Sequence, residues 1–150
     1  MPSAQIDTLV GTLSVTEDDG AITRLSWTSE GHDRTQLLDR AVEQLKAYFA
    51  RELQVFDLPL QVVGSAFQRA VCDAMLAIPL GQTRTYGDIS KELKMPPQPI
   101  GNACGANPIP VIIPCHRVLG STGLGGFSGG TGIETKITLL KHEGAASLLI

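Results

Sequence analysis

The sequence has 150 residues, enough for one or two small domains with a modest hydrophobic core. Its 43% hydrophobic and 18% charged residues are typical of a globular protein, and no apolar run approaches the ~20 residues of a membrane span. The first residues lack the basic and apolar regions of a secretory signal, so we expect a cytoplasmic protein without a membrane segment.

Charge is distributed unevenly along the chain. The net charge is −3, but residues 1–60 carry 5 Lys and Arg against 10 Asp and Glu, whereas residues 61–150 carry 7 against 5. Taken whole, the acidic balance argues against nucleic acid as a partner. The mildly basic second part is compatible with a small DNA-binding surface but does not require one.

The cysteines and histidines predict no metal site. Cys72, Cys104 and Cys115 are widely spaced and form no Cys-x-x-Cys pair, and the three histidines do not complete a zinc pattern with them. We therefore expect free thiols in a reducing compartment, with no metal and no cofactor.

The N-terminal part predicts a scaffold of strands and one helix. Alternating apolar residues between Ile6 and Trp27, interrupted by an acidic turn at 17–20, predict a β-hairpin. Apolar residues spaced by three and four predict a helix from about Thr35 to Arg51. Alternation from Phe56 to Leu60 predicts an edge strand, where Pro59 is tolerated. No motif in this part indicates catalysis.

Gly64-Ser65 predicts the boundary between two domains, residues 1–63 and residues 64–150. Ser65 is a good cap for a helix from about Ala66 to Ala77. A helix-turn-helix then follows. Thr85 caps a helix from Tyr86 to Leu93, and the turn at 94–97 cannot stay helical because two prolines end it.

The second helix of that pair is entered through Pro99, a residue tolerated in a first turn. It is rich in small residues, namely Gly101, Ala103, Gly105 and Ala106. Glycine costs a helix about 1 kcal/mol relative to alanine, so these residues indicate a need for close approach. The neighbouring surface is either the interior of the domain or DNA, and the segment that follows favours DNA.

Residues 108–117 read Pro-Ile-Pro-Val-Ile-Ile-Pro-Cys-His-Arg and hold the strongest chemical signal. Val111 to Ile113 predict a short, stiff, buried segment, and Pro114 fixes the backbone just before Cys115. Burial can desolvate the Cys115 thiol while the His116 imidazole takes its proton, directly or through one water. Without further context, a buried structural cysteine would be the more common interpretation.

The segment 120–132 contains seven glycines in thirteen residues and cannot be a regular element. A phosphate-binding loop would need Gly-Lys-Ser or Gly-Lys-Thr before a helix, which is absent. A flexible linker is less suitable because Leu124 and Phe127 look like packing anchors. A loop folded over a flat ligand is the third possibility, and the family resemblance of the chain, rather than the residues of this loop, favours it. A last helix is predicted from Glu134 to His142, with Gly144 ending it.

Pro114-Cys115-His116-Arg117-Val118, preceded by Asn107-Pro108, resembles the acceptor site of the O6-alkylguanine-DNA alkyltransferases, also called methylated-DNA–protein-cysteine methyltransferases. The resemblance covers most of the chain and is strongest from Phe67 to Gly144. It implies an α+β fold, in which a small N-terminal antiparallel sheet with a helix, RNase H-like, precedes a winged helix-turn-helix-like domain that carries the acceptor cysteine.

The resemblance also implies a function. Cys115 would take the alkyl group from O6-alkylguanine, or from O4-alkylthymine, in a nucleotide flipped out of double-stranded DNA, and the stable thioether would end activity after one event. The implied partner is alkylated DNA, bound by a monomer. His116 would act as the base, Glu143 would orient it, Asn107 would organise the turn, and Tyr86 would lie near the flipped phosphate and guanine N3.

The resemblance assigns further contacts with substrate or DNA. These would come from Gln98, Ala103, Arg117, Val118, Phe127, Ser128 and Lys136. The backbone carbonyls of Cys115 and Val118 would accept from the guanine amino group, and the Ser128 N–H would contact O6. Arg117 would be structural or directed at phosphate. Phe127 stands where many members carry tyrosine.

One position departs from the family pattern. Gln98 stands where members usually carry an arginine that fills the space left by the flipped base, so we expect weaker DNA binding and slower transfer. Three alternatives follow: a lesion-recognition protein that transfers weakly, a helix-turn-helix transcription factor in which Cys115 is a core residue, and a cysteine hydrolase. The presence of the acceptor cysteine counts against the first, and the lack of an evident substrate cleft counts against the third.

Overall fold

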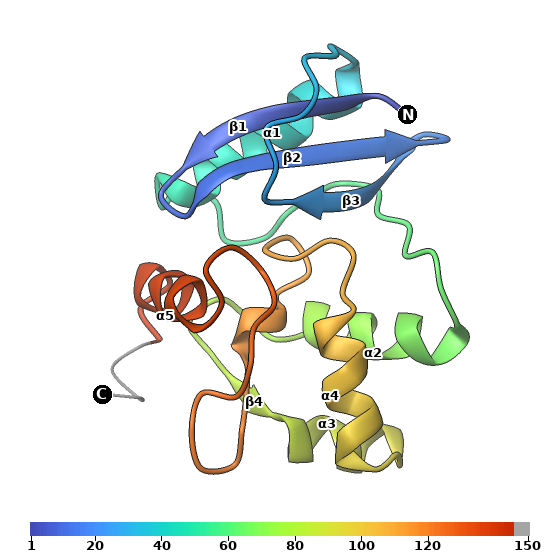
Figure 1. Cartoon of the computed structure of the whole chain (residues 1–150), viewed down its shortest axis with the longest axis vertical. Coiled ribbons are helices and arrows are strands. Elements are labelled where there is room, and N and C mark those ends of the chain that lie inside the picture. The colour runs from blue at the N-terminus through green and yellow to red at the C-terminus, as the bar shows by residue number, and fades with distance from the viewer. Residues whose placement is uncertain (146–150) are drawn as a thin grey trace.

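The computed structural model describes residues 1–145, so the last five residues of the predicted second domain lie outside it. The N-terminal part forms an antiparallel sheet of β1 (Ser3–Thr8), β2 (Gly11–Asp18) and β3 (Ala21–Ser26), in that order (Figure 1). The predicted hairpin is β2–β3, and the prediction missed β1. The apolar Leu9 and Val10 resembled strand residues, but they form the turn between β1 and β2.

Helix α1 (Gln36–Phe49) packs on one face of this sheet (Figure 1). The Thr35 hydroxyl caps it by accepting from the Leu38 N–H, and Leu38, Leu45 and Tyr48 face the core. The predicted edge strand at 56–60 was wrong. Only an isolated bridge joins Leu60 to Ile22, because proline at 59 has no N–H with which to extend a ladder.

The second part contains the predicted helix-turn-helix. The helices of this part are α2 (Ala66–Leu76), α3 (Tyr86–Leu93), α4 (Pro97–Gly105) and α5 (Ile133–His142), of which α3 and α4 form the helix-turn-helix. Thr85 and Asp88 form a reciprocal capping box at the start of α3, and Lys94 ends that helix in a left-handed conformation. Helix α4 begins at Pro97, slightly before the predicted entry at Pro99.

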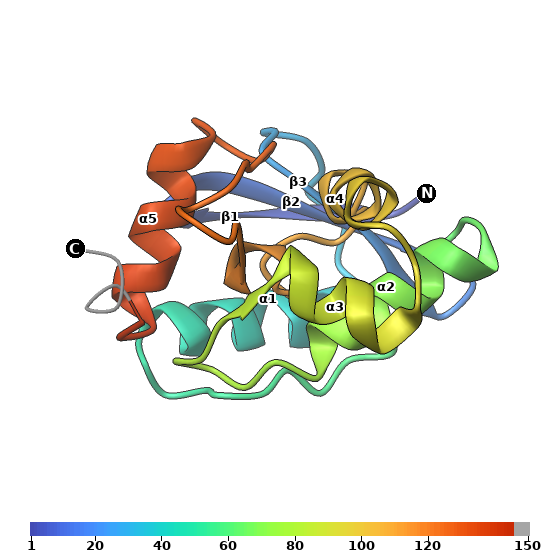
Figure 2. The same cartoon turned by 90° about the horizontal axis from the view of Figure 1, so that it is seen from below.

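The segment before Cys115 is buried, as predicted, but it is a tight turn in which Val111 has a φ of +72°. A single 3-10 turn, η1 (Cys115–Arg117), follows it and leads into β5 (Val118–Leu119). Strand β5 pairs in parallel with β4 (Arg84–Thr85), which directly precedes α3. The expected acceptor segment, residues 108–117, is thereby joined to the helix-turn-helix (Figure 2).

The two parts of the chain share one core. A single cluster of buried residues extends from the sheet and α1 to α2, α4 and η1. In addition, the Leu25 N–H of β3 donates to the Pro108 carbonyl at 3.0 Å, so the sheet contacts the acceptor segment directly. Within residues 1–145, no helix has both the length and the apolar character needed to cross a membrane.

Candidate active site

Cys115 is the first residue of η1 and is buried, with an exposed fraction of 9%. Asn107 shapes the turn that leads to it: its Nδ2 donates to the Ile113 carbonyl at 2.8 Å, and its Oδ1 accepts from the Ile109 N–H at 3.0 Å. Burial raises the pKa of the Cys115 thiol to about 11, although a hydrogen bond from Asn107 and the charge of Lys136 oppose this. The resting group is therefore a thiol.

The Glu143 carboxylate is the centre of a buried hydrogen-bond network. His116 Nε2 lies 2.7 Å from Oε2, Arg117 donates to both oxygens at 2.8 and 3.0 Å, and the Tyr48 hydroxyl donates to Oε2 at 2.5 Å. Burial alone would raise the pKa of Glu143. The hydrogen bonds and charges of His116 and Arg117 outweigh burial and hold that pKa at about 2.

These bonds determine which nitrogen of His116 is free. An ionised Glu143 can only accept, so the hydrogen of a neutral imidazole must lie on Nε2, and Nδ1 keeps its lone pair. Among residues 1–145, no group hydrogen-bonds to Nδ1, which is buried. Burial lowers the pKa of His116 despite the opposing effect of Glu143. The ring is therefore a neutral base at neutral pH.

A cavity of about 480 Å³ reaches Cys115. Its lining residues are Tyr86, Gly101, Cys104, Gly105, Cys115, Gly126, Phe127 and Ser128. The walls come from the start of α3, from α4 and from the glycine-rich loop. The loop lies close to Tyr86: Gly125 has a φ of +73°, and a Cβ there would lie 2.8 Å from the Tyr86 ring. A flat aromatic ligand matches the size and the aromatic walls of this cavity.

Lys136, on α5, holds the glycine-rich loop, residues 120–132, by a hydrogen bond. Its ammonium is buried and donates to the carbonyls of Val118 at 2.6 Å and Gly126 at 3.1 Å. It lies 5.9 Å from the centre of the Tyr86 ring. Burial lowers the pKa of Lys136 to about 8, although the nearby Cys115 and Cys104 act in the opposite direction.

The structure brings together five residues expected at the catalytic centre: Cys115, His116, Glu143, Asn107 and Tyr86. Phe127 and Ser128 line the cavity, and Ser128 Oγ donates to the Gly105 carbonyl at 3.2 Å. Gln98 is exposed in the first turn of α4, where it can meet a partner.

Four residues expected to contact substrate or DNA are buried, namely Ala103, Arg117, Val118 and Lys136, and the first two have no other described link to the Cys115 cavity. The Ala103 side chain is buried, with an exposed fraction of 4%, so its contact with DNA stays a prediction that the free protein does not favour. Arg117 is also buried and binds Glu143 and the Ile78 carbonyl, so of its two expected roles only the structural one fits. The two residues are buried for one reason: α4 and η1 turn these side chains toward the core.

Sequence reasoning missed Tyr48, which was predicted only as an apolar position on the first helix. Its hydroxyl reaches Glu143 across 95 residues of sequence, and burial together with the Glu143 charge raises its pKa far above the ordinary value. A buried tyrosine needs a partner for its hydroxyl, which was the one signal available. The sequence could not identify that partner.

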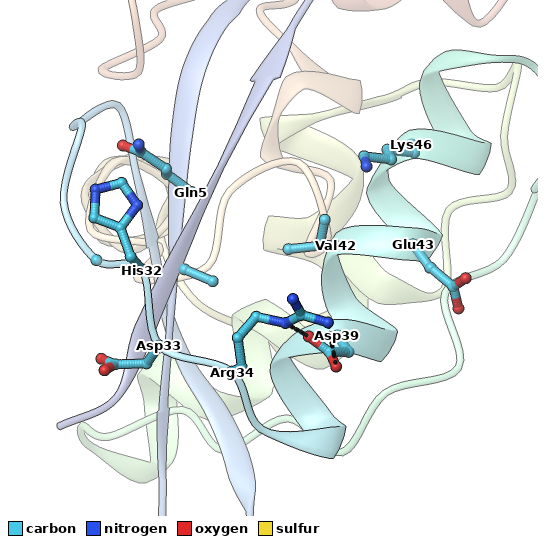
Figure 3. Close-up of a pocket in the computed structure, with 10 residues that line it drawn as sticks. Gln5, His32, Asp33, Arg34, Asp39, Val42, Glu43 and Lys46 are labelled. Carbon is cyan, nitrogen blue, oxygen red and sulfur yellow. Dashed lines mark hydrogen bonds and ion pairs between the residues drawn. The ribbon is translucent and has the colours of Figure 1, made fainter.

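Another cavity, of about 590 Å³, lies in the N-terminal part and contains none of the expected site residues (Figure 3). Its charged side chains are of both signs, with Arg34 paired to Asp39 at 2.8 Å and with Asp33, Glu43 and Lys46 around them. Such a mixture favours no single class of ligand. Cys115 and Tyr86, two residues expected at the catalytic centre, line the smaller cavity described above.

Comparison with known proteins agrees with this geometry. Residues 66–145 match the model of the 6-O-methylguanine DNA methyltransferase DNA-binding domain, and residues 3–62 match the model of the ribonuclease-like domain of the same family. This chain belongs to the methylated-DNA–protein-cysteine methyltransferase family.

Relatives of this methyltransferase-family chain are found among curated and solved proteins. A methylated-DNA–protein-cysteine methyltransferase of Mycolicibacterium paratuberculosis is 40% identical over 92% of this chain and 89% of the relative. The crystal structure of Mycobacterium tuberculosis O6-methylguanine methyltransferase superposes with a TM-score of 0.84 at 36% identity, covering 96% of this chain and 93% of that one. A structure of the M. tuberculosis protein in complex with DNA gives 0.83, also at 36% identity, covering 97% and 94%.

Proposed function

We propose that this chain repairs DNA by moving the alkyl group of an O6-alkylguanine, or of an O4-alkylthymine, onto Cys115, once per molecule. The observation that carries the proposal is the position of the Cys115 thiol at a purine-sized cavity beside the His116–Glu143 pair. The family membership supports the same reaction.

The proton path follows from the tautomer of His116. The thiol proton passes to Nδ1 of His116, through a water, while Glu143 holds the Nε2 hydrogen. The cysteine sulfur attacks the alkyl carbon, a carbon–sulfur bond forms, and the bond from that carbon to guanine O6 breaks. The guanine leaves with the electron pair and takes up one proton, supplied by the protonated His116 through water, so that the hydrogen of the thiol ends on guanine. The thioether has no leaving group for water to displace, so the reaction ends there.

The substrate carbon lies inside a duplex, so the nucleotide must rotate out to reach a cavity behind α3 and α4. In the proposed complex, Tyr86 and Phe127 are the aromatic walls that contact the flipped base. The carbonyls of Cys115 and Val118 are proposed to accept from its amino group, and the Ser128 N–H to contact O6. The Val118 carbonyl already accepts from Lys136, which leaves its second lone pair for guanine. Gln98 is proposed to fill the space that the base leaves.

The test uses intact mass. The protein is incubated with duplex DNA that carries one O6-methylguanine, and each molecule should gain one methyl group in place of one hydrogen, on Cys115. Cys115→Ala should gain nothing, whereas Cys72→Ala, which removes another buried thiol, should gain the group normally. Tight binding of the lesion with unchanged mass would instead support a lesion-recognition protein.

We propose further that the chain acts as a monomer on cytoplasmic DNA and is associated with the nucleoid when bound. Size-exclusion chromatography with light scattering, with and without a short lesion duplex, measures the first point. A complex with two protein molecules on a single-site duplex would contradict it.

A further inference from the structure

Trp27 is the only tryptophan of the chain and follows β3 in the N-terminal sheet, yet its ring lies against the glycine-rich loop of the other part. Its Nε1 donates to the Val10 carbonyl at 3.0 Å, which fixes the indole to the sheet. Its ring meets Phe127 edge-on, with the centroids 6.1 Å apart and the planes at 90°. The sheet is thereby linked to the wall of the Cys115 cavity.

The contact is tightly packed. A Cβ at Gly129 would lie 2.5 and 2.6 Å from two carbons of the indole and 2.8 Å from the Phe127 ring. No side chain fits there without displacing one of the two rings, so glycine is required. Trp27, Gly129 and Phe127 therefore form a continuous wall.

This wall borders a second cavity. The second cavity measures about 470 Å³ and lies between β3 and the loop, where Trp27, Arg24 and Pro110 form part of the lining. Cys115 and Phe127 line both cavities. The Phe127 ring and Cys115 therefore each border two spaces, and the position of the ring sets how wide the second space is beside the acceptor sulfur.

We propose that Trp27 is a positioning residue that holds Phe127 in place and thereby limits the size of the alkyl group that Cys115 accepts. This inference rests on the proposed function. A methyl group needs only the space at the sulfur. A benzyl group needs a flat space beside it, and the second cavity offers that space once the Phe127 ring moves.

The test compares transfer rates from duplex DNA carrying O6-methylguanine and O6-benzylguanine. Trp27→Ala should lower the methyl rate and raise the benzyl-to-methyl ratio by roughly tenfold, because a looser wall tolerates a larger group. Trp27→Phe keeps an aromatic contact with Phe127 and should stay near the wild-type ratio. Leu37→Ala, on the far helix of the same domain, removes a comparable half-buried side chain and should leave the ratio unchanged.

An unchanged ratio in Trp27→Ala, or an equal change in Leu37→Ala, would overturn this proposal while leaving the proposed function intact. If the wild-type protein transferred neither group, both would fall. A second measurement needs no variant. Trp27 is the sole indole, so its fluorescence emission should shift more after benzyl transfer than after methyl transfer, and equal emission in the two products would refute the role of Trp27.

Discussion

The two sides of Cys115 are built differently. On one side, Glu143 accepts from Tyr48, His116 and Arg117 in a buried network that joins both parts of the chain. On the other side, the cavity wall is a loop rich in glycine, held by a few contacts to Tyr86, Lys136 and Trp27. The first side can fix a proton path, and the second can adjust to the shape of a base. Rigidity is concentrated where proton transfer needs fixed geometry.

The largest expected effect is the loss of stability at low pH, when Glu143 in the buried network becomes protonated. The folded pKa of Glu143 is about 2 and the unfolded value is ~4.3, so its contribution is complete above ~4.3 and is lost as pH falls toward 2. The free energy of unfolding should fall by ~3 kcal/mol through that window because of this residue. Urea unfolding at a series of pH values measures it. Glu143→Gln should flatten the slope, whereas Glu52→Gln, at an exposed site, should retain it.

A smaller effect is expected when Tyr48 is changed to phenylalanine. The variant loses one hydrogen bond to a charged group, which should cost ~1.5 kcal/mol in unfolding free energy. Glu143 then shares its charge with fewer donors, so the pKa of His116 should rise. Because the protonated imidazole cannot act as a base, the fall in transfer rate on the acidic side should move to higher pH. The other tyrosine gives the control: Tyr86→Phe should lose less stability. Equal losses would mean that the Tyr48–Glu143 bond contributes nothing particular.

The smallest effect concerns the adaptable side, at the exposed first turn of α4. Gln98→Arg adds a charge near the proposed DNA surface, so affinity should rise by roughly fivefold, about 1 kcal/mol. The slope of log affinity against log salt should steepen by about 0.9 if one phosphate is newly contacted. Fluorescence anisotropy of a labelled duplex measures both. Gln82→Arg adds the same charge at another exposed position, and a matching gain there would show a non-specific effect.

Local signals predicted the helices, because caps and prolines act within a few residues. Thr85 begins α3 and Ser65 begins α2 as expected, and the helix-turn-helix prediction was confirmed. The failure to predict β1 has an equally local cause, because Leu9 and Val10 are apolar residues in a turn and resembled strand residues. The boundary between residues 63 and 64 stays a prediction.

Long-range partners could not be predicted. Cys115, His116 and Asn107 are neighbours in sequence, and their short pattern carries the chemistry. Tyr48 and Trp27 reach the site only after the sheet and α1 pack on the second part, and nothing local distinguishes them from ordinary core aromatics. The burial of Arg117 was equally hidden, because an arginine beside an acceptor cysteine suits a phosphate as well as a buried carboxylate.

Helix α5 positions residues at both sides of the site. Lys136, near its start, supports the loop over the cavity, and Glu143, just after its end, aligns the base, with the two positions on one face of the helix. A small rotation or translation of α5 would displace Lys136 and Glu143 together. A substitution in α5 that adapts the cavity to a new lesion would therefore alter the proton chemistry as well, whereas a substitution at an exposed position of α4, such as Gln98, would leave that chemistry unchanged.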